Sequence, residues 1–188
     1  MHNDTLPCII AVSGLKRSGK TTVAEALVSE IASRGYRVGS VKTIQHHPLS
    51  LDAAGSDTRR HAEAGAEFII ALLDHETAYF EPRSSRGSFR ETARLFRPGV
   101  QFIVWEGVVD DDARALHVVC LRSMDDLGRT LEVRGIPTDS VLAISGVAAS
   151  SHGESGPRAR PPSFNVTDPS QRRALADLII GTSGMERK

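Results

Sequence analysis

The stretch Gly14-Leu15-Lys16-Arg17-Ser18-Gly19-Lys20-Thr21 matches the pattern G-x-x-x-x-G-K-[ST] at every fixed position. Before it, residues 8–12 (C-I-I-A-V) form a short apolar run that predicts a buried strand. From Lys20 onward, apolar residues recur at helical spacing. A strand, a glycine-hinged turn and a helix N-terminus form a phosphate-binding loop, because backbone N–H groups and the positive helix end both attract anions. The stretch therefore predicts nucleotide binding.

Individual residues in and near this loop have distinct expected roles. Residues 14–22 are expected to contact the nucleotide; among them Lys20 reaches the β- and γ-phosphates, and the Thr21 hydroxyl holds Mg²⁺. Such a site needs a carboxylate near the metal, and Glu106 directly follows the apolar run 102–105 (F-I-V-W). A carboxylate at the end of a buried strand is costly without a cation or a hydrogen-bond partner. Glu106 is therefore the expected second metal residue, with an exposed glutamate at a strand tip as the alternative.

The composition is that of an ordinary globular protein. A length of 188 residues and a mass of 20.3 kDa predict one domain over residues 1–188. The formal net charge is zero, which argues against nucleic acid or an anionic membrane as a partner. No secretory signal or apolar run of 18 residues is present, so a cytoplasmic location is expected. Cys8 and Cys120 both lie in apolar runs and are expected to be buried free thiols.

Short apolar runs alternate with helical patterns along the chain, which predicts an α/β fold. We expect a P-loop NTPase-like three-layer sandwich: a mostly parallel sheet covered by helices, with a small antiparallel hairpin as an extension. The open edge of this hairpin suggests a homodimer. Residues 147–163 lack periodicity and are expected to form a mobile loop, and residues 164–166 a last edge strand or a docking turn. The other expected strands are 37–43, 67–73, 77–80, 101–105, 117–121 and 141–145, and the later helices cover 57–64, 88–96, 124–133 and 168–180.

A second informative stretch follows the loop and its helix. The chain between Val41 and Ala66 reads V-K-T-I-Q-H-H-P-L-S-L-D-A-A-G-S-D-T-R-R-H-A-E-A-G-A and resembles the MobB family, the molybdopterin-guanine dinucleotide biosynthesis adapter proteins. Residues 105–107 (W-E-G), 141–146 (V-L-A-I-S-G) and 164–169 (F-N-V-T-D-P) are similar to that family too. Two positions depart from its pattern, Thr43 in place of His and Ser56 in place of Lys. The matching positions are Val41, Lys42, His46, His47, Asp52, Gly55, Asp57, Thr58, Arg60, Ala64, Gly65 and Ala66.

The resemblance implies a GTP-binding protein that uses Mg²⁺ and hydrolyses GTP slowly. It would assist the molybdopterin guanylyltransferase that couples GMP to molybdopterin, and molybdopterin itself or a molybdoenzyme is a further expected partner. Lys20, Asp57 and Arg60 are then the expected catalytic residues. Lys42, His46, His47, Asp52 and His61 are added to the nucleotide-binding set.

Other interpretations of these residues stay open. A small-molecule kinase on the same fold would use Asp57 as base and Arg59 or Arg60 to clamp the transferred phosphate. A regulatory GTPase would order residues 44–57 around the γ-phosphate. His46 and His47, with nearby carboxylates, also permit a metal site. Guanine preference rests on the resemblance alone, because the chain has no late N-K-x-D element; base contacts are expected after residues 145–146.

Overall fold

The computed structural model describes residues 6–44, 55–81, 89–107, 115–150 and 161–186. The chain divides into two compact units, residues 1–43 with 89–188, and residues 44–88. The expected domain over residues 1–188 therefore contains two units, and each is considered by itself below. No helix in the described part of the chain is both long and apolar enough to cross a membrane.

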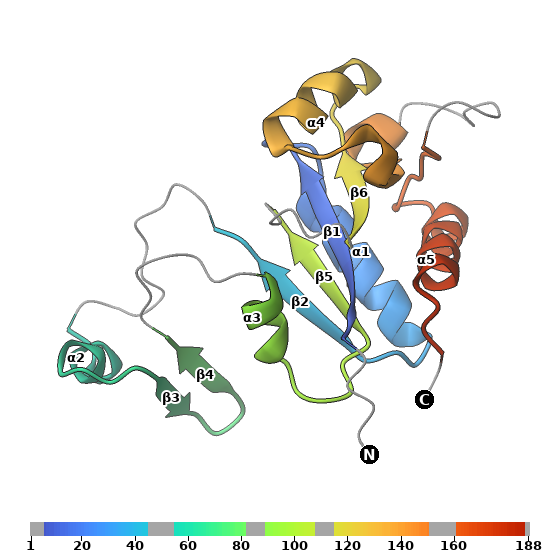
Figure 1. Cartoon of the computed structure of the whole chain (residues 1–188). Helices are drawn as coiled ribbons and strands as arrows, with labels where there is room; N and C mark the ends of the chain where they lie inside the picture. Colours follow the sequence, from blue (N-terminus) through green and yellow to red (C-terminus); the bar gives the residue numbers. More distant parts are fainter. Residues whose placement is uncertain (1–5, 45–54, 82–88, 108–114, 151–160, 187–188) are drawn as a thin grey trace. The chain divides into compact units, whose positions relative to one another are not determined.

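The first unit holds a five-stranded sheet in the order β2-β5-β1-β6-β7 (Figure 1). All four strand pairings are parallel, so the carboxyl ends of the five strands lie along one edge of the sheet. This confirms the predicted α/β fold. The strands are β1 (Cys8–Gly14), β2 (Val38–Lys42), β5 (Phe102–Glu106), β6 (Leu116–Cys120) and β7 (Val141–Ser145). The helices of this unit are α1 (Lys20–Ser33), α3 (Phe89–Arg94), α4 (Leu127–Arg134) and α5 (Pro169–Ser183), with short 3₁₀ helices at Met124–Asp126, Thr138–Ser140 and Val147–Ser150.

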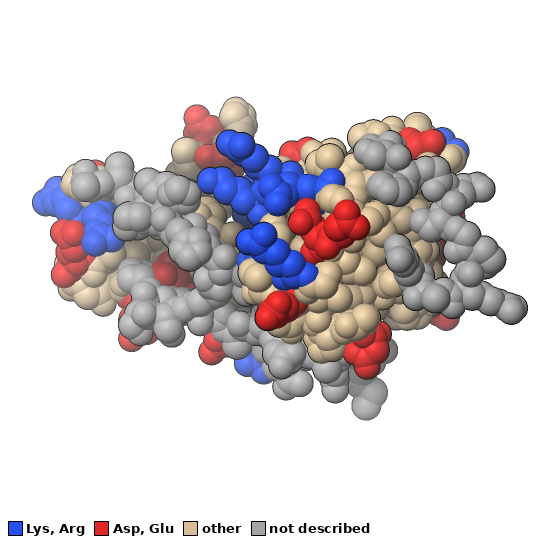
Figure 2. Space-filling view, turned by 90° about the horizontal axis from the view of Figure 1, so that it is seen from above, with Lys and Arg blue, Asp and Glu red and all other residues tan. Residues whose placement is uncertain are grey.

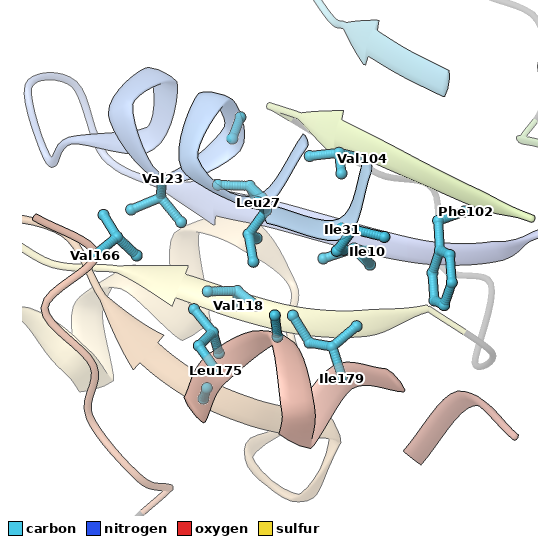
Figure 3. Close-up of a cluster of buried hydrophobic side chains, with 14 of the residues drawn as sticks. Ile10, Val23, Leu27, Ile31, Phe102, Val104, Val118, Val166, Leu175 and Ile179 are labelled. Carbon is cyan, nitrogen blue, oxygen red and sulfur yellow. The ribbon is translucent and has the colours of Figure 1, made fainter. Parts of the chain in front are cut away.

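One face of the sheet is covered by α1 and α5. Side chains alternate along a strand, so Ile10 of β1 points into this layer while its neighbours point to the other face. There it packs with Leu27 of α1 and Leu175 of α5 in a cluster of fully buried apolar side chains (Figure 3). Ion pairs at the surface join the same helices, since Glu30 of α1 binds Arg172 of α5 at 3.2 Å.

The opposite face is covered by α3 and α4. Ala93 of α3 and Phe96, which follows this helix, pack on the apolar side chains of β1 and β5. Strand β2 has a glycine at position 39 because a Cβ there would collide with the Phe96 ring. Next to β6 and β7, Leu131 of α4 packs on Val119 and on other buried residues. The two covered faces confirm the three-layer sandwich.

The helix ends follow the local signals in the sequence. Helix α1 begins at Lys20, and Gly35 behind it has a φ of 86°, the left-handed conformation expected of a glycine that follows a helix. Helix α5 begins after Asp168, whose carboxylate accepts the backbone N–H of Ser170 at 2.7 Å. It continues to Ser183, three residues beyond its expected end.

The prediction of a mobile loop over residues 147–163 is wrong at both ends of this segment. Its first four residues form a 3₁₀ helix in which Ala148 and Ala149 are buried, because they pack under the end of β7. Its last residues lie alongside β7, since Ile144 donates to the Pro162 carbonyl at 2.8 Å and accepts from the Phe164 N–H at 3.0 Å. This edge interaction therefore begins two residues before the predicted segment 164–166. Residues 151–160 lie outside the described ranges.

The second unit contains α2 (Asp57–Glu63), β3 (Ile69–Leu72) and β4 (Thr77–Phe80). The two strands form an antiparallel pair, which confirms the predicted hairpin. The hairpin forms a two-stranded sheet of its own. Helix α2 begins after Ser56, whose Oγ accepts the Arg59 N–H at 3.1 Å, and Gly65 follows the helix with a positive φ.

Both cysteines are free thiols, as expected. Cys120 is fully buried, and burial raises its pKa to about 12. Cys8 is only partly buried, which differs from the expectation, and desolvation raises its pKa to about 11. Because the thiolate is the reactive form, both side chains are unreactive near neutral pH.

Candidate phosphate-binding site

Residues 14–21, called the P-loop below, connect β1 to α1. Gly14 is the last residue of β1, and Gly19 precedes the first turn of α1 with a φ of 87°. Arg17 has a φ of 62°, which is uncommon for a residue with a side chain. Two left-handed residues this close together turn the chain sharply between the strand and the helix.

The Leu15 carbonyl organises the interior of the P-loop. It accepts the Ser18 hydroxyl at 2.9 Å and the Lys20 ammonium at 2.6 Å, so Lys20 folds back over the loop. Burial lowers the pKa of Lys20, and the positive charges of Arg134 and Lys42 lower it further, whereas Glu106 acts in the opposite direction. A cation that is partly removed from water in this way gains from an anion beside it.

Within the described part of the chain, the first backbone N–H groups of α1 lack the side-chain hydrogen-bond acceptors that often cap the N-terminus of a helix. The structure describes no side-chain cap there and no acidic residue in the first turn. In contrast, Asp168 caps α5 and Ser56 caps α2. The first N–H groups of α1 are therefore directed toward the P-loop without a side-chain acceptor, an arrangement suited to a phosphate.

Glu106 links three elements at the carboxyl edge of the sheet. Its Oε1 accepts the Thr21 hydroxyl of α1 at 2.8 Å, and its Oε2 lies 3.3 Å from the Lys42 ammonium at the end of β2. The Glu106 side chain is 13% exposed, so this is not a freely solvated glutamate at a strand tip. The Thr21 hydroxyl and the Glu106 carboxylate are hard oxygen donors at one point, which fits Mg²⁺.

Two contacts from the C-terminal half complete the loop, and the sequence analysis missed them. The Val147 N–H donates to the Ser18 carbonyl at 3.3 Å, and a Cβ on Gly146 would collide with the same carbonyl. The Arg134 guanidinium donates to the Gly14 carbonyl at 2.6 Å. No local pattern marks Arg134, because 120 residues separate it from its partner.

The other predicted site residues are distributed over three parts of the chain. Within the P-loop unit, Lys16, Arg17 and Thr22 are exposed. In the second unit, Asp57, Arg60 and His61 are exposed on α2, where Arg60 pairs with Asp57 at 3.3 Å; their role at a nucleotide stays a prediction. His46, His47 and Asp52 lie outside the described ranges. Among the described residues, no group of three or more His, Cys, Asp or Glu side chains is arranged to bind a metal.

Charged side chains are prominent at the carboxyl ends of the five parallel strands, which face the viewer in Figure 2. Figure 2 shows Lys and Arg side chains gathered near the centre of this view, with Asp and Glu side chains beside them. In the P-loop unit, Lys16 and Arg17 of the P-loop and Lys42 at the end of β2 are exposed, and Glu106 is the carboxylate that pairs with Lys42. An excess of fixed cations around a glycine-rich turn favours a polyanionic ligand.

The fold and this loop define a P-loop protein of the α/β class. The family model described as "Molybdopterin guanine dinucleotide synthesis protein B" matches residues 9–130, more than half of the chain. The chain belongs to this family, MobB, which agrees with the resemblance found in the sequence.

Individual relatives show the same likeness over shorter stretches. The molybdopterin-guanine dinucleotide biosynthesis adapter protein of Haemophilus influenzae is 36% identical over 76 residues, which are 40% of this chain and 42% of that protein. The Escherichia coli adapter protein is 30% identical over 78 residues, or 42% and 44% of the two chains. The matched stretches thus span less than half the length of these curated relatives.

The structural likeness extends over nearly the whole chain. The crystal structure of Bacillus subtilis MobB superposes with a TM-score of 0.66 at 21% identity, covering 91% of this chain and 97% of that one. A MobB homologue from Bacillus stearothermophilus gives a TM-score of 0.61 at 22% identity, covering 95% and 99%. At these identities the comparison establishes the shared fold.

We predict that Gly146→Ala destabilises the P-loop unit more than Gly184→Ala. Both glycines have a positive φ, 88° and 64°, so both substitutions should cost about 1 kcal/mol from backbone strain. Only at Gly146 does the added Cβ meet other backbone, whereas nothing lies within 4 Å of the Cβ position at Gly184. The added collision should cost about 1–3 kcal/mol more. Urea unfolding followed by the fluorescence of Trp105 measures both, and equal losses would show that Gly146 does not pack tightly on the P-loop.

Proposed function

We propose that this chain is a GTP-binding adapter protein that assists the formation of molybdopterin-guanine dinucleotide. The observation that carries the proposal is the Glu106 carboxylate held between the Thr21 hydroxyl and the Lys42 ammonium, at the mouth of a P-loop in a MobB-family chain. A hydroxyl, a carboxylate and two lysines at one point suit a metal-bound nucleoside triphosphate. The adapter role is named for the relatives from Haemophilus influenzae and Escherichia coli, and is extended to this chain as a proposal.

In this proposal, the chain's own groups bind and position the phosphates. The N–H groups at the start of α1 and the Lys20 ammonium neutralise the phosphate oxygens, and Lys42 adds a second cation from β2. Thr21 and Glu106 would hold Mg²⁺, which when bound neutralises the charge that develops on the phosphates. Asp57 and Arg60 are the proposed additional catalytic residues, and they lie on α2 in the other unit.

Base recognition is proposed at the ends of β6 and β7. The segment that follows Ser145 contacts the P-loop backbone directly, through the Val147 N–H and the Ser18 carbonyl. Because this backbone lies beside the P-loop, we propose that it contacts the base of a nucleotide whose phosphates occupy the P-loop. The guanine preference of the proposal is taken from the family, since no N-K-x-D element is present.

Hydrolysis is proposed to be slow and accessory to the adapter role. In the P-loop unit, the described polar side chains around Lys20 and Thr21 bind phosphate and metal, and Glu106 is already engaged by two partners. A carboxylate held in this way is a poor general base. The proposed partner of this adapter is a molybdopterin guanylyltransferase, and molybdopterin or a molybdoenzyme is a further proposed partner.

The hairpin of the second unit supports a proposed homodimer. Cross-strand neighbours Ile70 and Tyr79 are 59% and 46% exposed, Leu72 is 80% exposed, and Phe68 lies with its ring 5.9 Å from that of Tyr79. These four large apolar side chains, exposed on one short hairpin, are unusual for a surface in water, and among the described residues neither β3 nor β4 has a second partner strand. A second copy of the hairpin would cover both features.

We predict that Mg²⁺–GTP binds at least tenfold more tightly than Mg²⁺–ATP, and that Lys20→Ala weakens GTP binding about 10–100-fold. Loss of a charge-assisted hydrogen bond to phosphate accounts for that range. Isothermal titration measures the affinities, and Arg173→Ala, which removes an exposed cation on α5, serves as the control for net charge. A preference for ATP would contradict the adapter and favour a kinase, and unchanged binding by Lys20→Ala would show that GTP binds elsewhere.

For the dimer, Leu72→Asp should shift the chain to monomers in sedimentation velocity, because the new carboxylate would be buried at the interface. Val133→Asp is the matched control, since Val133 is an exposed apolar residue on α4 (59% exposed). The same sedimentation coefficient for wild type and Leu72→Asp would contradict an interface at the hairpin.

A further inference from the structure

Strand β2 lies at one edge of the five-stranded sheet, and it carries Lys42 at its carboxyl end. Among the described residues it pairs with β5 alone, in a register that sets Lys42 opposite Glu106. The end of an edge strand frays readily, because one of its sides has no hydrogen-bonded neighbour. Lys42 is also 58% exposed, so its 3.3 Å contact with Glu106 does not hold the strand in place.

Thr43, the next residue, is fastened to β5 more firmly than Lys42. Its N–H donates to the Glu106 carbonyl at 2.9 Å, which extends the ladder by one bond. Its Oγ1 accepts the indole N–H of Trp105 at 2.7 Å. On its other side, a Cβ at position 107 would approach the Thr43 Cβ to 3.0 Å, so Gly107 leaves just enough room for it.

Trp105 is well placed to act as a rigid anchor. It is 4% exposed and belongs to the apolar cluster under α3, so its ring has little freedom to move. It also immediately precedes Glu106. The indole therefore joins β5, the strand that carries Glu106, to Thr43, the last residue of the first segment of the P-loop unit; after Thr43 the chain enters residues 44–88.

We propose that Trp105 and Thr43 are a pair of positioning residues for Lys42. The hydrogen bond between them pins the carboxyl end of β2 to β5, and so keeps the Lys42 ammonium beside Glu106 at the mouth of the P-loop. Neither side chain of the pair belongs to the residues proposed to bind the nucleotide. The inference rests on the proposed function insofar as Lys42 serves a bound phosphate, whereas the pinning of β2 is a property of the protein without any ligand.

The pinning is tested first, by hydrogen–deuterium exchange on the nucleotide-free protein. Thr43→Val keeps the branched shape but removes the hydroxyl acceptor, so the amides of residues 38–43 should exchange about fivefold faster, as expected for the loss of one hydrogen bond. Thr43→Ser keeps the acceptor and should exchange as the wild type does. Trp105→Phe removes the indole N–H and should repeat the result of Thr43→Val. Equal exchange in Thr43→Val and Thr43→Ser would overturn the inference, whether or not GTP binds.

The second test asks whether the pair acts through Lys42. Thr43→Val should weaken Mg²⁺–GTP binding about fivefold in the wild-type chain, and should have no further effect in a Lys42→Gln background. A purely structural effect on the fold would weaken binding equally in both backgrounds, and that result would reject positioning of Lys42. Failure of the wild-type chain to bind GTP would contradict the proposed function, while the exchange measurement would still decide whether β2 is pinned.

Discussion

The hydrogen bond between Thr21 and Glu106 is the interaction on which the candidate site depends. It joins the first turn of α1 to the end of β5, and the two bonded residues are 85 positions apart in the chain. A parallel sheet makes this contact possible, because it brings the carboxyl ends of all five strands to one edge. The P-loop turn at the end of β1 then places the start of α1 against that edge. The helix start, the carboxylate and the Lys42 ammonium meet there.

Close backbone packing is the second constraint at this edge. Gly14 lies against the Cys120 carbonyl and Ser18, and Gly146 lies against the Ser18 carbonyl, so a Cβ at either position would collide with its neighbours. The P-loop is thus enclosed by the ends of β6 and β7 as well as by its own hydrogen bonds. Arg134 adds a further contact by donating to the Gly14 carbonyl. A loop held on several sides can present its N–H groups to a phosphate without first becoming ordered, which favours binding.

Local patterns in the sequence were enough to predict most of the fold. The glycine-lysine motif and the apolar runs located β1, α1 and the other strands to within about two residues, because a buried strand or an amphipathic helix has a period of its own. The position of Glu106 directly after a buried strand was enough to predict its meeting with Thr21. The ends of the segment 147–163 were misjudged, because small and polar residues such as Ala148 are buried by tertiary packing that no local period records.

Long-range contacts could not be predicted in this way. Arg134 and Gly14, or Trp105 and Thr43, are far apart in the chain and share no motif. Trp105 meets Thr43 because β5 lies beside β2 although it comes later in the chain, and Arg134 meets Gly14 because α4 contacts β1. The roles of Asp57, Arg60 and His61 came from the family resemblance, and their exposed positions on α2 leave those roles as predictions.

A crystal structure grown with Mn²⁺ and a non-hydrolysable GTP analogue would show whether the metal and the nucleotide bind at the P-loop. Mn²⁺ takes the same oxygen ligands as Mg²⁺ and is located by its anomalous scattering. We predict one strong peak at the Thr21 hydroxyl and the Glu106 carboxylate, with the phosphates over residues 14–21. A metal and nucleotide bound away from the P-loop, or a peak at the site that persists unchanged in Thr21→Val, would contradict it.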